Sequence, residues 1–245
     1  NYGFRKIISI LTLAAMTAAV FVSCTPSYKT VKRMQRMEEN VGNPTTKEEY
    51  EEAIKKYEKR ALDLSTAEAQ TGIWYKILGT RYLDQRMYGR ALECFQKAIA
   101  FYPDNANLFY YVGVCAGYMA NASLDFDASG SNPKKLNYLK LSEEGYIRAL
   151  ELDPKYYRAM YGISVLYLFE TNEPEKAIPH MERFLQTQTK DIDGLFLLAR
   201  AYYMNYEFEK AVTLYDKIIQ LNPNAEKVTE AQNNKKIVLD ALQAK

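Results

Sequence analysis

The 245-residue sequence has one histidine, three cysteines and almost no net charge. The histidine, His180, has no nucleophile arranged with it, and no closely spaced pair of cysteines or glycine-rich phosphate loop is present. The residues that zinc sites, phosphate-binding loops and Ser-His-Asp catalysis require are therefore missing. We predict that the protein is not an enzyme and uses no cofactor or metal, and we expect His180 to be a surface residue.

The charge balance argues against a nucleic-acid partner. The formal charge is +2, and the first 23 residues carry Arg5 and Lys6 without an acidic residue, so the remainder is balanced. A neutral chain exerts no long-range attraction on phosphates. The basic residues between positions 47 and 60 are interleaved with acids, as on a solvated helix face.

The N-terminus has the order of a bacterial export signal. Arg5 and Lys6 precede an uncharged stretch over residues 7–22, followed by Ser23 and Cys24. At about 1.5 Å per residue this stretch spans roughly 24 Å, short of the ~30 Å hydrocarbon core, which disfavours a permanent transmembrane helix. The segment 21–24 resembles the lipobox of bacterial lipoproteins, with Phe21 where leucine is usual. The resemblance implies a signal peptide over 1–23 and lipidation of Cys24. The alternative is a simple secretory signal that is cut nearby.

A lipid anchor would place the protein in the bacterial cell envelope, facing the periplasm or the cell surface. Thr25 stands after the anchor where some inner-membrane lipoproteins have aspartate, so the outer membrane is favoured. Residues 24–45 are interpreted as the anchor cysteine and a tether. Thr46 and Glu49 form a capping box before apolar residues at helical spacing, which predicts a helix over about 47–64. We interpret 46–71 as an N-terminal helix, either separate or half of a degenerate repeat.

An internal repeat with a period near 34 residues dominates the region 72–224. The spacing of the prolines supports this register, since Pro103 to Pro154 is 51 residues, one period plus 17, and Pro154 to Pro223 is 69, two periods plus one. The first copy contains Tyr75, Leu78, Gly79, Tyr82, Ala91, Phe95, Ala98 and Pro103. The later copies contain Phe109, Val112, Gly113, Tyr146, Ala149 and Pro154, then Met160, Ile163, Tyr167, Ala177 and Met181, then Leu195, Leu198, Ala199, Tyr202, Ala211, Tyr215 and Pro223.

These copies resemble the tetratricopeptide repeat. Together with the lipobox-like segment, they make the chain similar to bacterial lipoproteins that contain this repeat. The resemblance implies an all-α protein, a right-handed solenoid or superhelix of antiparallel helix pairs, with about four repeats. The 17 extra residues are expected near 119–138, looping outward between the helices of the second pair. Gly79 and Gly113 should allow the paired helices to approach closely. Residues 225–245 should form a capping helix, apolar at Val228, Ala231, Val238 and Leu242.

In this family the first helices of successive pairs line a concave groove, and the positions not used for packing face it. Here those positions are Lys76, Thr80, Asp84, Asn107, Tyr110, Val114, Tyr118, Arg158, Tyr161, Val165, Phe169, Phe196, Arg200 and Tyr203. Aromatic and arginine side chains are typical of binding anchors, which favours a peptide or a small apolar ligand. The alternative is that several of these aromatics pack on neighbouring helices. Family members that clamp chaperone C-termini carry lysine, asparagine and arginine at these positions. In this sequence tyrosine, valine and phenylalanine replace most of them, so we do not expect that class of partner.

Two functions fit these features. The first is a lipid-anchored adaptor that binds a protein or peptide partner in the groove and reaches the membrane through its anchor. The second is a lipoprotein that accompanies a transporter and handles a small apolar ligand or docks a periplasmic solute-binding protein. Cys94 and Cys115 lie on helices that should adjoin, so they form either a disulfide or two buried free thiols.

Overall fold

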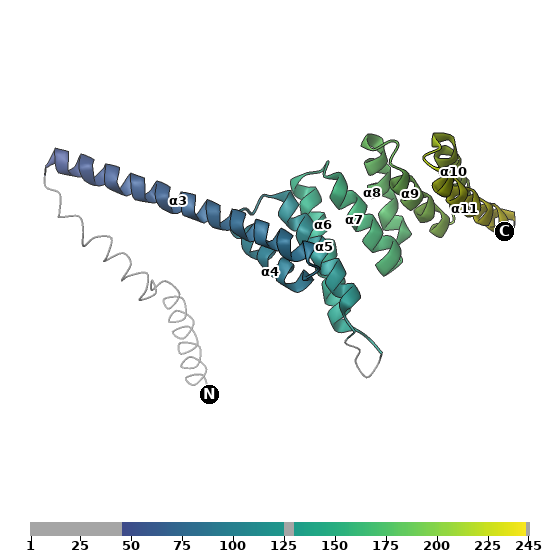
Figure 1. Ribbon diagram of the computed structural model, residues 1–245, viewed down its shortest axis with the longest axis horizontal. Coiled ribbons are helices and arrows are strands. Elements are labelled where there is room, and N and C mark those ends of the chain that lie inside the picture. The colour runs from purple at the N-terminus through teal and green to yellow at the C-terminus, as the bar shows by residue number, and fades with distance from the viewer. Residues whose placement is uncertain (1–45, 125–129, 244–245) are drawn as a thin grey trace, which may run out of the picture. The chain divides into compact units, whose positions relative to one another are not determined.

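The computed structural model describes residues 46–124 and 130–243, and these residues form helices and connecting turns without a β-strand (Figure 1). The all-α prediction is confirmed. The predicted signal peptide, the anchor Cys24 and the tether lie outside the described residues.

Within the part of the chain that the structure describes, none of the helices combines the length and the apolar character that a membrane span requires.

The chain divides into two units, Asn1–Leu64 and Ser65–Lys245. The described part of the first unit belongs to helix α3 (Lys47–Asp84), and it begins at the predicted capping box. The backbone N–H of Thr46 donates to the Glu49 carboxylate at 3.1 Å, and the N–H of Glu49 donates to the Thr46 hydroxyl at 3.3 Å. Two backbone donors that the first turn would leave unpaired are thereby satisfied.

Helix α3 corrects the predicted boundary near residues 64–72. The helix runs without a break from Lys47 to Asp84, so the predicted N-terminal helix and the first helix of the repeat array are one helix. The sequence explains this, because residues 65–71 contain alanine, glutamate and glutamine, which favour helix, and no proline or glycine.

The second unit is a succession of antiparallel helix pairs in which each helix contacts the next one along the chain (Figure 1). The C-terminal part of α3 packs on the next helix through Gly79 and Phe95. The further helices are α4 (Tyr88–Ile99), α5 (Ala106–Ala122), α6 (Pro133–Leu152), α7 (Tyr157–Leu166) with its π-helical continuation η1 (Tyr167–Thr171), α8 (Pro174–Thr187), α9 (Ile192–Met204), α10 (Phe208–Leu221) and α11 (Ala225–Gln243).

The same tight turn joins the two helices of the first, third and fourth pairs. In each turn, the backbone carbonyl of a tyrosine accepts a hydrogen bond of 2.8 Å from a backbone N–H at the start of the next helix. These bonds run from Met87 to Tyr82, from Glu173 to Tyr167 and from Glu207 to Tyr202. The residue before each donor has a positive φ, 58° at Arg86, 55° at Asn172 and 60° at Tyr206. A left-handed residue reverses the chain within three positions.

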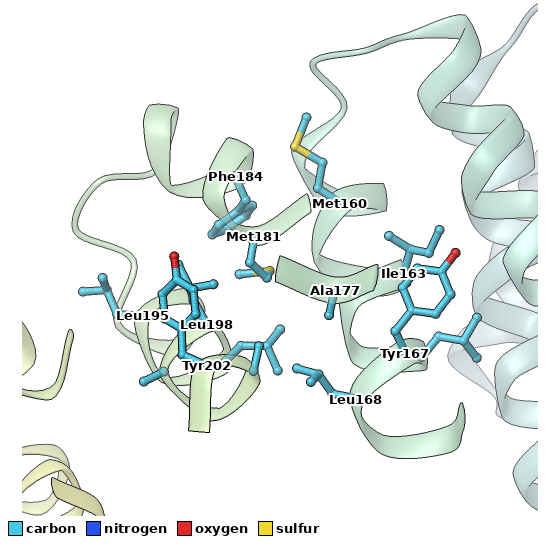
Figure 2. Close-up of a cluster of buried hydrophobic side chains, with 14 of the residues drawn as sticks. Met160, Ile163, Tyr167, Leu168, Ala177, Met181, Phe184, Leu195, Leu198 and Tyr202 are labelled. Atoms are coloured by element: carbon cyan, nitrogen blue, oxygen red, sulfur yellow. The ribbon is translucent and has the colours of Figure 1, made fainter. Parts of the chain in front are cut away.

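The residues that carry the sequence repeat form the core. Figure 2 shows the third and fourth pairs, where the small Ala177 lies among larger apolar side chains from facing helices. A second cluster joins α4 and α5 around Phe95 and Leu108. Leu78 is an exception, with 42% of its surface exposed, and so are the repeat prolines Pro103, Pro154 and Pro223. In the repeat pattern this leucine faces a preceding helix, but the residues before it are the same continuous helix α3.

The insertion predicted near 119–138 does not loop out over its whole length. Helix α5 continues to Ala122, and α6 begins at Pro133 after the N-cap Asn132. The Asn132 side chain accepts from the Lys135 N–H at 2.8 Å and donates to the Ser123 carbonyl at 2.9 Å, which holds the two helix ends together. Asn-Pro is a helix-start signal, so the sequence contained the information for this boundary.

The prediction that His180 is a surface residue is wrong. It lies half-buried on α8, its ring stacks on Tyr167 with centroids 6.2 Å apart, and its Nδ1 atom is buried without a hydrogen-bond partner among the described residues. Burial, assisted by the nearby Arg183, lowers the pKa of His180 below its usual value. The folded protein therefore holds this imidazole in its neutral form.

We expect this histidine to make stability depend on pH. Its folded pKa is lower than the unfolded value of about 6.5, so the unfolded chain takes up a proton first as the pH falls. The stabilisation is present above about pH 6.5 and decreases towards pH 5. Urea unfolding at several pH values should show this slope in the wild type and a smaller one in His180→Phe. Equal slopes would contradict the assignment.

Candidate functional site

The first helices of successive pairs present two adjoining pockets. The central pocket has a volume of about 300 Å³ and lies between α5, α6 and α7. Its floor includes Tyr146 of α6, whose burial raises the pKa of its phenol and keeps it neutral. The lining residues are Tyr110, Val114, Gly117, Tyr118, Asn121, Ser142, Tyr146, Tyr161, Gly162, Val165, Leu166 and Glu170.

The C-terminal pocket has a volume of about 450 Å³ and lies between α7 with η1, α9 and α11, with α10 at its floor. Tyr161 and Val165 of α7 line both pockets, so the two share one wall. The other lining residues of the C-terminal pocket are Phe169, Asp193, Phe196, Leu197, Arg200, Tyr203, Met204, Tyr215, Glu230, Asn234, Ile237 and Val238.

Nine of the fourteen predicted groove residues line these two pockets, and all nine lie on α5, α7, η1 or α9. Several also touch neighbouring aromatics, as the alternative interpretation expected. Tyr118 stacks on Tyr88 with ring centroids 4.4 Å apart, and Tyr110 meets Tyr156 edge to face at 5.5 Å. These contacts fix the rings in place while other edges face the pocket, which suits preorganised binding.

The remaining five predicted residues lie elsewhere. Asn107 donates from its side-chain amide to the Tyr156 hydroxyl at 2.7 Å and lines a separate hollow at the turns between pairs. Lys76, Thr80 and Asp84 on α3 line none of the three pockets described for residues 46–124 and 130–243, and neither does Arg158. The Thr80 hydroxyl instead donates to the Lys76 carbonyl at 3.0 Å.

The sequence analysis missed the contribution of α11. This helix was predicted only as a cap, but Glu230, Asn234 and Ile237 form a wall of the C-terminal pocket. Their spacing of four and three residues places them on one helix face and was the available signal. Ile237 keeps 55% of its surface exposed, so this face of the cap is not uniformly polar.

Charges at the C-terminal pocket are partly paired. The Lys227 ammonium lies 3.3 Å from Asp193 and 3.3 Å from Glu230, and 5.1 Å from the centre of the Phe196 ring. These contacts raise the pKa of Lys227. Burial raises the pKa of Tyr215 to about 12, partly offset by Arg200, so this phenol is neutral and able to donate a hydrogen bond.

Cys94 and Cys115 are free thiols, which resolves the two alternatives. Burial raises the pKa of Cys115 to about 12 and also raises that of Cys94. Thiols with a raised pKa carry little thiolate and react slowly. Both side chains therefore act as small apolar packing residues.

Comparison with known proteins decides the family. A family model described as "Tetratricopeptide repeat" matches residues 192–225, which contain α9 and α10. A protein of Borreliella burgdorferi named "TPR repeat-containing protein" is 23% identical over 186 residues, 76% of this chain and 78% of that protein. The chain contains a tetratricopeptide repeat at residues 192–225. The predicted family is confirmed, and the antiparallel pairs are its repeats.

Solved structures show the same fold. The chain is similar to the segment of MamA from Desulfovibrio magneticus RS-1 that runs from residue 41 to its end, with a TM-score of 0.54, 16% identity, and coverage of 71% of this chain and 92% of that segment. It is also similar to YrrB, described as a TPR protein with an unusual peptide-binding site, with a TM-score of 0.52, 20% identity, and coverage of 84% and 88%. At these identities the likeness establishes the tetratricopeptide superhelix.

Proposed function

We propose that this tetratricopeptide-repeat protein is a non-catalytic adaptor that is lipid-anchored at Cys24 in the bacterial cell envelope and binds a partner polypeptide in its groove. The observation that carries the proposal is the pair of adjoining pockets on α5, α7, α9 and α11. Two pockets that share the wall formed by Tyr161 and Val165 suit an extended chain, because successive side chains of one segment can occupy both.

The residues of these pockets favour a peptide. Tyrosine and phenylalanine lose little conformational entropy on binding, cover a large area and, in tyrosine, retain a hydroxyl for the peptide backbone. Phe169 and Tyr118 expose 51% and 48% of their surface, so they are accessible to a partner. The similar protein YrrB is also described as having a peptide-binding site.

The test is crosslinking in living cells from photoreactive residues at Tyr110, Tyr161 and Phe196, which lie along the groove. Lys140 on α6 is the matched control, because its side chain is 74% exposed and lines neither pocket. We expect the three groove positions to capture the same polypeptide and Lys140 to capture none. Capture of a lipid or small molecule alone would contradict a groove-bound polypeptide and would favour the ligand-handling function. Equal capture of the polypeptide at Lys140 would show that binding is not confined to the groove.

The anchor is supported by the export-signal order of residues 1–23 and the lipobox-like segment that ends at Cys24. Several acyl chains on one cysteine, each methylene contributing about 0.8 kcal/mol, would hold the protein at a membrane. We expect radiolabelled fatty acid to attach to the wild type and not to Cys24→Ser, which should leave the outer-membrane fraction. A Cys24→Ser protein that stays membrane-bound would disprove this anchor and leave the groove proposal intact.

A further inference from the structure

The C-terminal pocket contains a positive charge without an acidic partner. The Arg200 guanidinium lies 4.7 Å from the centre of the Phe169 ring, within cation–π range. In the part of the chain that the structure describes, Arg200 forms no ion pair, and its side chain is exposed. A guanidinium resting on a ring keeps the N–H donors along its edge free to meet a planar carboxylate.

The other cation at this pocket is already engaged. Lys227 lies 3.3 Å from Asp193 and 3.3 Å from Glu230, so this one lysine is shared by two carboxylates and has no capacity left for a ligand. Beside Arg200 itself, which contacts no carboxylate in the described part of the chain, a basic group of a ligand would be repelled. Charge complementarity therefore selects an occupant with a negative group opposite Arg200.

The rest of the pocket selects an apolar side chain. Val165 of α7, Phe196 of α9 and Tyr215 of α10 line the cavity, and Ile237 contributes an exposed apolar surface from α11. A volume of about 450 Å³ lies within the range of ligand pockets, roughly 300–1,000 Å³. An aromatic or large aliphatic side chain would displace water from this surface, which is favourable in proportion to the apolar area covered.

We propose that the C-terminal pocket recognises a peptide segment in which an aromatic or large apolar residue lies close to an aspartate or glutamate. The apolar side chain enters between Val165 and Phe196, and the carboxylate pairs with Arg200. The inference rests on the proposed polypeptide partner and specifies its chemistry.

The position of Arg200 indicates an acidic side chain and not the carboxyl terminus of the partner. Arg200 lies on α9, with α7 and η1 as one wall of the pocket and α11 as the other. A peptide that crosses the first helices from the central pocket passes Arg200 with residues on both sides of it. The carboxylate that meets Arg200 therefore comes from within the segment.

Acetylated and amidated pentapeptides can test this with the full chain in an NMR titration. Ala-Phe-Ala-Glu-Ala should bind about five- to tenfold more tightly than the neutral isostere Ala-Phe-Ala-Gln-Ala, because only the first supplies a carboxylate. A third probe, Ala-Phe-Ala-Gln-Ala with a free C-terminus, distinguishes the source of the carboxylate. Tighter binding of this third peptide than of the glutamate peptide would overturn the inference.

Variants locate the effect. Arg200→Gln should bind the glutamate and glutamine peptides equally, and Arg200→Lys should retain part of the preference because it keeps the charge. Arg158→Gln is the matched control, since Arg158 was predicted for the groove but lines neither pocket, and it should retain the full preference. Circular dichroism checks that each variant is folded.

The outcomes separate this inference from the function on which it rests. Equal binding of the two blocked peptides by the wild type, or no binding of either at about 10 mM, would overturn the acidic–aromatic specificity even if crosslinking captures a polypeptide. Crosslinking that captures no polypeptide would overturn the adaptor function whatever the peptides do. A glutamate preference that Arg200→Gln abolishes and Arg158→Gln retains would support the inference.

Discussion

Replacing Tyr146 by alanine should lower the free energy of unfolding by about 3–4 kcal/mol. Tyr146 lies on α6 with 7% of its surface exposed, and its ring packs against glycines on both neighbouring first helices. A Cβ atom added to Gly113 of α5 would lie 2.8 Å from this ring, and one added to Gly162 of α7 would lie 2.7 Å from it. The ring therefore fills the joint between the second and third repeats, and alanine would leave a cavity there.

The control for this prediction is Tyr146→Phe, which keeps the ring and removes the hydroxyl. We expect it to change the free energy of unfolding by about 1 kcal/mol or less. Equilibrium urea unfolding of the wild type and both variants measures the difference. A loss in Tyr146→Ala no larger than that in Tyr146→Phe would show that the ring does not hold the joint.

The core could be predicted from the sequence because a repeat reports the same packing position several times. Phe95, Tyr146, Met181 and Tyr215 occupy equivalent places in successive second helices, and all four are buried. Leu78 holds a position of the repeat pattern and yet exposes 42% of its surface. The residues directly before it continue the same helix α3, as the helix propensity of residues 65–71 favours.

The groove could be predicted only in part. Helical register placed Phe196 and Arg200 on one face of α9, and Tyr161 and Val165 on one face of α7, because residues three or four positions apart share a face. Register cannot tell which hollow between helices is deep enough to be a pocket, since that depends on packing at the ends of the array. The wall formed by Asn234 and Ile237 belongs to a helix outside the repeat pattern.

Hydrogen bonds between repeats were also beyond the sequence analysis. The Tyr167 hydroxyl donates to Glu143 at 2.8 Å, and the Tyr202 hydroxyl donates to Glu182 at 2.5 Å, so two successive first-helix tyrosines are tied to the preceding second helix. The separations of 24 and 20 residues differ, and a search for a constant period does not find them. Such contacts depend on the rotation of one pair against the next.

The second large effect is expected at Gly145 on α6. A Cβ atom there would lie 2.7 Å from the backbone nitrogen of Gly113, 2.9 Å from the carbonyl oxygen of Phe109 and 3.0 Å from the Gly113 Cα. Backbone atoms of a neighbouring helix cannot rotate away as a side chain does, so α5 and α6 would have to separate. We expect Gly145→Ala to lower the free energy of unfolding by about 2–3 kcal/mol, although alanine is a better helix former than glycine.

Gly117→Ala on α5 is the matched control, because it makes the same change in the same helix pair. A Cβ at Gly117 would meet only the Ser142 hydroxyl at 3.4 Å, an ordinary contact, so alanine should be neutral or stabilise the protein by up to about 1 kcal/mol. In thermal and urea unfolding, we therefore expect the midpoint to fall in Gly145→Ala and to stay unchanged or rise in Gly117→Ala. Equal, small shifts in both variants would mean that α5 and α6 are not in backbone contact at Gly145.

Tyr146 directly follows Gly145 on α6, so we expect the two sites to be coupled. The double variant Gly145→Ala with Tyr146→Ala should lose less free energy of unfolding than the sum of the two single variants, because the space left by the ring lets the helices shift.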